Sequence, residues 1–378
     1  MQIPFSRSAR SSLGVEWELA LVDSDSGDLR QVAQTVLDAV APADGREHPT
    51  IRQELLLNTV EIVTGVCHTV PEAGRDLQRS IDELRAITDP LRVELMCAGT
   101  HPFARWNNQK VTDKQRYATL IDRTQWWGRQ MLIYGVHVHV GIEDRDKVLP
   151  ILSAVLTYFP HLQSLSASSP FWGGKDTGYA SNRALMFQQL PTAGLPFQFQ
   201  RWEDLEVYAA DMLHTGVIDQ FDEIRWDLRP SPRFGTLEMR ICDGASNLTE
   251  VLAFAALIHC LVEHFSTMLD EGKELPSLQP WFAQENKWRS ARYGMDAIII
   301  LNSRGDEELV TEAVPKLLTE LEPVAERLGC ATELDGVRTI LRKGASYQRQ
   351  RAVARRHGGD LGAVVAALVA EMRAGKPL

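Results

Sequence analysis

In the stretch GVEWELALV (residues 14–22), polar and apolar side chains alternate. Successive side chains of a β-strand point to opposite faces, so Glu16 and Glu18 share one face. The residues between and beside them, Trp17 included, share the other face. The stretch therefore predicts a β-strand with an acidic face and an apolar back.

Three further stretches repeat this alternation, each with charged or imidazole side chains on one face. They are GVHVHVGI (135–142) with His137 and His139, GTLEMRIC (235–242) with Glu238 and Arg240, and TVEIVT (59–64) with Glu61. Any one of these faces alone is most simply explained as a solvated strand face. Solvated faces usually mix Lys, Thr, Ser and Gln, whereas these four carry almost only Glu, His and Arg. Together they indicate a shared site.

These residue types suit a hard divalent cation. Mg²⁺ and Mn²⁺ prefer carboxylate oxygens and tolerate an imidazole, and Mg²⁺ usually completes its shell with water and substrate phosphate. We therefore predict two or three ions that draw the γ-phosphate of ATP towards an acceptor. The predicted metal ligands are Glu16, Glu18, Glu54, Glu61, His137, His139 and Glu238.

Three residues are also predicted to take part in catalysis: Arg240 and the two metal ligands Glu238 and Glu61. Arg240 follows Glu238 on the same strand face and is expected to stabilise the phosphoryl group during transfer. Glu61 is the third predicted catalytic residue. Glu54 precedes Glu61 by seven residues, too far to share its strand face by alternation, so we expect it to enter from a loop or strand edge.

Composition excludes several other classes of protein. The 378 residues carry a formal net charge of −10, which argues against a nucleic-acid-binding surface. The basic stretch Arg349–Arg356 is interpreted as a solvated helix face. No secretory signal is apparent, and the most apolar stretches, Ala297–Leu301 and Ala363–Leu368, are short of the roughly 20 residues that cross a bilayer. Five cysteines without a C-x-x-C pair indicate reduced thiols. We expect a cytoplasmic protein without membrane contact.

Helical patterns separate the predicted strands, which on local grounds favours parallel βαβ units. The predicted helices are Pro71–Arg85, Thr112–Leu132, Asp144–Tyr158, Glu203–His214 and Thr249–Leu269. From about residue 305 onward the chain is predicted to be helical throughout, including Leu361–Met372. No linker divides the chain, so residues 1–378 are predicted to form one domain. Neither G-x-G-x-x-G nor G-x-x-x-x-G-K-[ST] occurs, so any nucleotide is held in another way.

Long blocks of the sequence resemble the carboxylate–amine ligases of the glutamate–cysteine ligase type 2 family. The blocks are LGVEWELALVD (13–23), ELLLNTVEIVTGVC (54–67), GTHPFARWNNQKVTDKQRY (99–117), YGVHVHVGI (134–142), SPFWGGKDTGYASNR (169–183), WDLRPSPRFGTLEMRICD (226–243) and NKWRSARYGMDA (286–297). The resemblance implies an α+β, glutamine-synthetase-like fold, in which a curved antiparallel sheet forms a funnel flanked by helices. It thus overrides the local indication of parallel strands.

The resemblance also implies an activity and a division of the ligands. ATP would phosphorylate the side-chain carboxylate of glutamate, and an amine such as cysteine would then form a γ-glutamyl amide, with release of ADP and phosphate. One metal would be held by Glu18, Glu54 and Glu61, and another by Glu16, His137 and Glu238, with His139 as ligand or neighbour. Trp17 stands where relatives often carry a glutamate, and alternation directs it away from the metals.

Residues between the strands are candidates for binding ATP or substrate. They are Lys175, Ser181, Arg183, Arg229, Arg289 and Arg292. A homodimer is expected from the resemblance to the family and because strands at the edge of a sheet can pair with a second copy of the chain. Two other functions stay open at this point. Zinc hydrolases also use His-x-His on a strand, and a non-catalytic relative would bind nucleotide or metal only.

Overall fold

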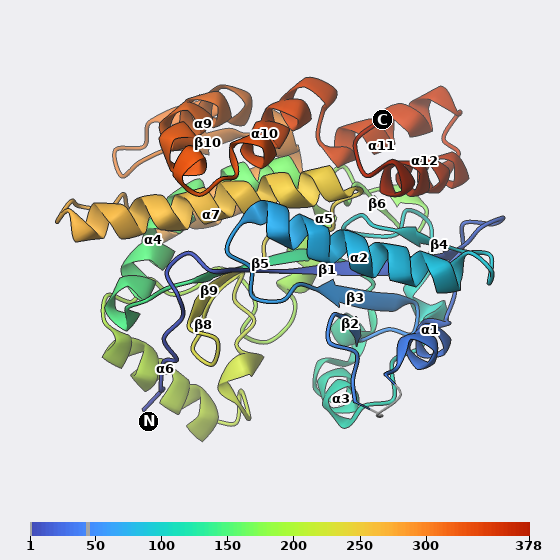
Figure 1. The fold of residues 1–378 in the computed structure, drawn as a ribbon, viewed down its shortest axis with the longest axis horizontal. Helices are drawn as coiled ribbons and strands as arrows, with labels where there is room; N and C mark the ends of the chain where they lie inside the picture. Colours follow the sequence, from blue (N-terminus) through green and yellow to red (C-terminus); the bar gives the residue numbers. More distant parts are fainter. Residues whose placement is uncertain (1, 43–45) are drawn as a thin grey trace.

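The structure, a computed structural model, describes residues 2–42 and 46–378, and within these ranges seven strands form one sheet (Figure 1). The sheet has the order β2-β3-β1-β5-β9-β8, and β4 pairs with the far end of β1. Its strands are β1 (Leu13–Asp23), β2 (Ile51–Gln53), β3 (Thr59–Val63), β4 (Val93–Met96), β5 (Val136–Gly141), β8 (Leu228–Ser231) and β9 (Thr236–Met239). Two small hairpins, β6 (Phe171–Trp172) with β7 (Lys175–Asp176) and β10 (Ile298–Ile300) with β11 (Glu307–Leu309), lie outside it.

Every neighbouring pair of strands in the sheet is antiparallel. The antiparallel sheet expected from the family resemblance is confirmed, and the local indication of parallel βαβ units is wrong. The reason is that β3 and β4 do run in the same direction but are not neighbours. Both pair antiparallel with β1, which lies between them, so the crossover between them joins strands that never share hydrogen bonds.

Twelve α-helices surround the sheet in the described part of the chain. They are α1 (Ala33–Val40), α2 (Val70–Thr88), α3 (Gln115–Arg129), α4 (Arg145–Ser166), α5 (Asn182–Phe187), α6 (Trp202–His214), α7 (Leu248–Asp270), α8 (Pro280–Tyr293), α9 (Val310–Arg327), α10 (Ala331–Lys343), α11 (Ser346–Arg356) and α12 (Leu361–Ala374). The five helices predicted before residue 305 are confirmed as α2, α3, α4, α6 and α7. Their bounds differ from the prediction by at most three residues, except that α4 continues eight residues past Tyr158 to Ser166. Several begin at the caps that the sequence offers: Thr69 and Glu72 form a capping box on α2, and Asn247 caps α7.

The helices lie on both sides of the sheet and divide its two faces (Figure 1). Helices α2, α4 and α7 pack against the apolar back of the strands, where Trp17 and Val138 are fully buried. The outer helices α9 and α10 pack on α7 in turn. On the opposite side, a cavity between the sheet, α1 and α3 leaves the charged face accessible. The division follows the alternation in the sequence, because the apolar back must be covered to leave water.

Two core helices, α4 and α7, are long and apolar enough to span a membrane by length and composition alone. This differs from the prediction, which considered only uninterrupted apolar runs. Their most apolar windows are 83% and 72% buried inside the protein. Burial on nearly all sides explains their composition, because a helix covered by neighbours has no polar face to keep.

The C-terminal region is mostly helical, as predicted, but begins with strand β11, so helix throughout from residue 305 is wrong. The solvated-face interpretation of Arg349–Arg356 is also wrong at its first residue. Arg349 is largely buried and pairs with Glu250 of α7 and Glu371 of α12 at 2.8 Å each, whereas Arg355 and Arg356 are exposed. The basic stretch therefore anchors the C-terminal helices to the core.

Candidate active site

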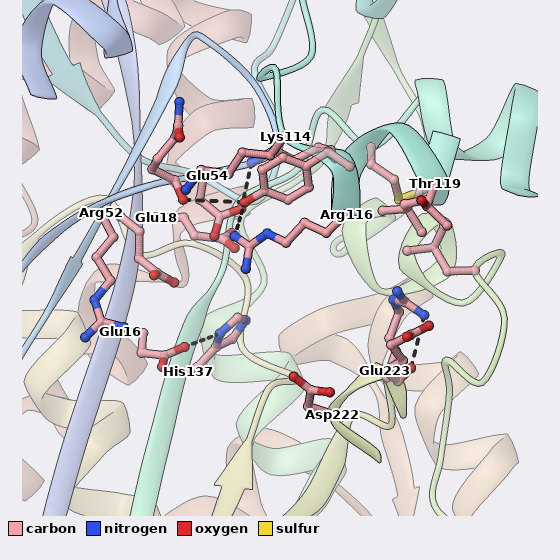
Figure 2. Close-up of a pocket in the computed structure, with 18 of the residues that line it drawn as sticks. Glu16, Glu18, Arg52, Glu54, Lys114, Arg116, Thr119, His137, Asp222 and Glu223 are labelled. Carbon is pink, nitrogen blue, oxygen red and sulfur yellow. Dashed lines mark hydrogen bonds and ion pairs between the residues drawn. The ribbon is translucent and has the colours of Figure 1, made fainter. Parts of the chain in front are cut away.

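A cavity of about 1110 Å³ lies over the charged face of the sheet. Its floor is formed by β1, β3 and β5, and its walls come from α1, α3 and the segment 217–229. Figure 2 shows Glu16, Glu18, Glu54 and His137 directed into this space, with Arg116 of α3 reaching in from the other wall. The cavity is large enough for a nucleotide and a small amino acid together.

Strand register brings the predicted ligands together on the cavity floor. Glu16 of β1 lies opposite His137 of β5, and Glu18 lies opposite Glu61 of β3. One strand further along, His139 and Glu238 lie opposite each other. Cross-strand neighbours on one face are about 5 Å apart, so the register alone creates a row of ligand groups. Trp17, between the two β1 glutamates, is fully buried on the other face.

Two groups of side chains are close enough to share a cation. One is Glu16, His137 and Glu238, and the other is Glu18, Glu61 and His137. In each group the ligand atoms lie within 4.8 Å of one another. The first group is the second ligand set implied by the family resemblance. The second group differs from the implied set, because His137 stands in it in place of Glu54.

Glu54 nevertheless lines the same cavity, just after the end of β2. Its carboxylate accepts a hydrogen bond of 2.9 Å from the backbone N–H of Leu55, and its backbone carbonyl accepts one from Thr112. These contacts fix Glu54 at the edge of the sheet, the entry point expected from its spacing to Glu61.

Three carboxyl groups of this floor have raised pKa values. Burial and the neighbouring charge of Glu54 raise the pKa of Glu18 to about 8. Burial also raises the pKa of Glu54, and burial together with the charges of Glu54, Glu16 and Glu18 raises that of Glu61 well above its usual value. Buried carboxylates in mutual contact need either protons or a cation. Their oxygens are the donors that Mg²⁺ and Mn²⁺ prefer, so the donor set fits the predicted metals.

The histidines of β5 differ in their surroundings. Burial and the positive charge of Arg240 lower the pKa of His137 to about 4, so its imidazole is neutral and can coordinate a metal. Glu16 accepts a hydrogen bond of 3.0 Å from His137 Nδ1, and although burial opposes ionisation, its bonds to the two histidines hold its pKa well below the usual range. His139 instead pairs its Nδ1 with Thr236 Oγ1 at 2.9 Å and belongs to neither metal group among the described residues.

Glu238 lies between two arginines. Arg229 donates from Nε at 2.6 Å, and Arg240 donates from Nη1. Burial alone would raise the pKa of Glu238, but the charges of Arg240 and Arg229 hold it low. The Nε of Arg240 has no hydrogen-bond partner among the described residues, although it is buried. A buried donor without a partner is costly, so this atom is available to an anionic group.

Arg183 of α5 also lines the cavity and is buried. Its guanidinium lies against Gly135, where a Cβ atom would come within 2.2 Å of Nη2. It donates to the backbone carbonyl of Arg240 at 3.3 Å. Because Gly135 has no side chain, the guanidinium group of Arg183 can lie against the backbone just before β5, at the cavity.

The other predicted ATP or substrate residues do not line this cavity. Lys175 is exposed on β7, and Ser181 caps α5 while donating to the buried carboxylate of Asp243 at 2.8 Å. Arg289 pairs with Glu285 and Glu307, and Arg292 donates to the carbonyl of Gly178. The positive charge of Lys175, Arg289 and Arg292 suggested phosphate contacts, but the two arginines are paired outside the cavity and Lys175 is exposed away from it. Of the six, Arg183 and Arg229 reach the cavity.

Arg116 and Tyr117 line the cavity and were not predicted as site residues. Both lie in the DKQRY end of a block that carries the family resemblance, which was the available signal. No alternation marks them, because they belong to the first turn of helix α3.

Comparison with known proteins agrees with this geometry. Residues 12–367 match the profile of the family described as "Glutamate-cysteine ligase family 2(GCS2)". The chain belongs to glutamate–cysteine ligase family 2. It is 61% identical over 380 residues to the protein named "Putative glutamate--cysteine ligase 2-1" of Arthrobacter sp. (strain FB24), with 99% of each chain covered. It is 59% identical to a similarly named protein of Leifsonia xyli subsp. xyli (strain CTCB07), again with 99% of each covered.

A solved structure supports the fold. The glutamate–cysteine ligase of Francisella tularensis, determined in complex with AMP, superposes with a TM-score of 0.67. The alignment covers 98% of this chain and 90% of that one at 14% identity, so it bears on the fold alone. Membership of the family confirms the predicted enzyme class, a ligase that forms carbon–nitrogen bonds.

Proposed function

We propose that this family 2 ligase uses ATP and Mg²⁺ or Mn²⁺ to join the side-chain carboxylate of glutamate to an amine, with an acyl phosphate as intermediate. The observation that carries the proposal is the pair of cation-binding groups that share His137, next to Arg229 and Arg240. Carboxylates, a neutral imidazole and arginines in one cavity are the requirements of phosphoryl transfer to a carboxylate.

Each residue contributes a separate part of this chemistry. Bound Mg²⁺ would neutralise phosphate charge and draw the γ-phosphate towards the acceptor. Glu16, His137 and Glu238 would hold one ion, and Glu18 and Glu61, with Glu54 nearby, another. Arg240 would direct its unpaired Nε at the phosphoryl group in transfer, while Arg229 keeps Glu238 ionised. An oxygen of the glutamate side-chain carboxylate would first attack the γ-phosphorus as the bond to ADP breaks. The neutral amine would then attack the acyl carbon and lose a proton, and phosphate would leave as the carbon–oxygen bond breaks.

The experiment is a turnover assay with defined components. Protein, ATP, Mg²⁺ and glutamate are incubated with one amine at a time, cysteine first, and phosphate release is followed while products are identified by mass. The expected result is release that depends on one amine and yields a γ-glutamyl amide. Glu18→Gln should abolish it with the fold intact. Glu94→Gln, a matched change on β4 outside the cavity, should not.

The alternatives have less support. A zinc hydrolase built on His137 and His139 would need both in one ligand group, and neither group in the described residues contains the pair. Full activity without ATP, with one tightly held zinc ion, would establish it. A non-catalytic protein is the remaining alternative, and it predicts no turnover across a broad panel of substrates. A cytoplasmic location and a homodimer stay predictions, the latter open to sedimentation analysis.

A further inference from the structure

Arg116 reaches into the cavity from the wall opposite the sheet (Figure 2). It occupies the first turn of α3, and its guanidinium stacks over the ring of Tyr117 at 4.4 Å from the ring centroid. It also donates to the Tyr117 hydroxyl. Tyr117 is itself buried and donates to the backbone carbonyl of Gln53 at 3.4 Å. The arginine is thus held in place from β2, beside Glu54.

The charge of Arg116 is not neutralised by an ion pair within the described residues. By contrast, Arg229 and Arg240 are paired with Glu238 on the floor. Arg123 lies seven residues further along α3. It is near Asp219 and Glu223 and donates to two backbone carbonyls. A guanidinium group carries several N–H donors in a planar arrangement that matches a carboxylate. Arg116 uses one of these donors in its hydrogen bond to Tyr117. The others face the cavity.

From this geometry we infer that Arg116, positioned by Tyr117, binds the α-carboxylate of an amino-acid substrate. The inference rests on the proposed function and adds a specificity-determining residue: Arg116 selects a substrate with a free carboxylate beside the reacting group. Arg116 stands across from the carboxylate row, so a substrate held by its α-carboxylate at Arg116 would extend towards the floor. That orientation would direct a side-chain carboxylate, or an incoming amine, to the cation groups.

Either substrate could supply this carboxylate, and paired ligands separate the two. Glutamate and its α-amide, isoglutamine, differ only at the α-carboxylate of the donor. Cysteine and cysteamine differ only at the carboxylate of the acceptor. Binding is measured by calorimetry in the presence of Mg²⁺ and a non-hydrolysable ATP analogue, which requires no turnover, and kcat/KM is measured in the phosphate-release assay.

Arg116→Gln should weaken binding of the carboxylate-bearing partner of one pair by about 100-fold, since a hydrogen-bonded charge is lost. The affinity for the matching ligand without that carboxylate, isoglutamine or cysteamine, should change less than about threefold. The affinity for the ATP analogue should change equally little. Arg129→Gln, the same change at an exposed position of α3 outside the cavity, should alter nothing. Tyr117→Phe should give a smaller loss with the same selectivity.

Two results would overturn the inference. One is an equal loss for both ligands of each pair in Arg116→Gln, which would mean a general disturbance of the cavity. The other is loss of the ATP analogue alone, which would mean a phosphate contact. If the wild type binds glutamate through Arg116 but releases no phosphate with any amine, the proposed function fails while this inference stands.

Discussion

Glu18 belongs to one of the two proposed cation-binding groups, where a bound cation would displace its proton. Its pKa of about 8 in the fold exceeds the ordinary value of 4.5, because it is buried beside Glu54. A raised pKa stabilises the fold fully below pH 4.5, and that contribution is lost as the pH rises through about 8. Glu54 and Glu61 act in the same direction. We therefore expect the metal-free protein to melt at a lower temperature at pH 9 than at pH 6, and Mg²⁺ to raise Tm more at pH 9.

Thermal unfolding in EDTA and in excess Mg²⁺, across this pH range, measures the effect. Glu18→Gln should reduce both the loss of stability at high pH and the size of the Mg²⁺ shift. A Mg²⁺ shift of equal size at every pH would contradict the assignment of the cation to this cluster.

Arg240 is expected to act on the rate of reaction more than on binding. It is buried against Glu238, and its unpaired Nε is available to a developing phosphoryl charge. Arg240→Ala should lower kcat by about 100- to 1000-fold, the cost of removing one preorganised donor to a transition state. KM for ATP should change little. Arg355→Ala, an exposed arginine of α11, is the control, and a defect confined to ATP affinity would refute the role.

Strand β1 shows how one element serves both core and site. Trp17 is fully buried against the helices, between two glutamates that face the cavity. Trp17→Ala should cost about 3–5 kcal/mol of unfolding free energy, because it empties a large buried volume. Mg²⁺ affinity of the folded protein should be unchanged, since the side chain faces away from the ligands. Urea unfolding and metal titration measure the two quantities. Trp126→Ala, at a side chain that is 59% exposed, should change stability by less than about 1 kcal/mol.

The same strand explains what the sequence could predict. Faces follow from a period of two along one segment, so Glu16, Glu18, Glu61, His137 and Glu238 were accessible to local reasoning. The order in which the strands pair cannot be deduced from any single segment of the sequence. Two strands joined by α2 run in the same direction but are separated by β1, and no pattern within either of them records that.

Residues outside the strands were harder to place for a related reason. Lys175, Arg289 and Arg292 carry the charge expected of phosphate contacts, but Lys175 is exposed outside the cavity, and Glu307 and Gly178 hold the two arginines away from it. Arg116 enters the cavity only because α3 folds over the sheet. Charge type predicts chemistry, whereas tertiary packing decides which charges meet.

At the scale of the whole molecule, the C-terminal helices are part of a single core. One continuous cluster of buried apolar side chains extends from Ile3 to Met372, and α12 packs against β4 while α10 packs against α7. The predicted single domain, 1–378, therefore implies one cooperative unfolding transition. Circular dichroism and tryptophan fluorescence should report the same midpoint. Separate transitions would show that residues from about 305 onward fold as a unit of their own.

Arg349 tests this coupling between the C-terminal helices and the core. It is the cation shared by Glu250 of α7 and Glu371 of α12, and both carboxylates are buried. Arg349→Ala leaves two buried carboxylates without their counter-ion, which should cost about 3–5 kcal/mol. Burial already raises the pKa of Glu250, and loss of the arginine would raise it further. Because a raised pKa means stability lost with rising pH, the variant should be closer to wild type at pH 5 than at pH 8.

Arg351→Ala, two residues along the same helix, removes only a partly exposed pair with Asp176 and should cost at most about 1 kcal/mol. Urea unfolding at both pH values measures the difference, and a loss at Arg349 that is equal at the two pH values would show that the buried carboxylates do not govern it.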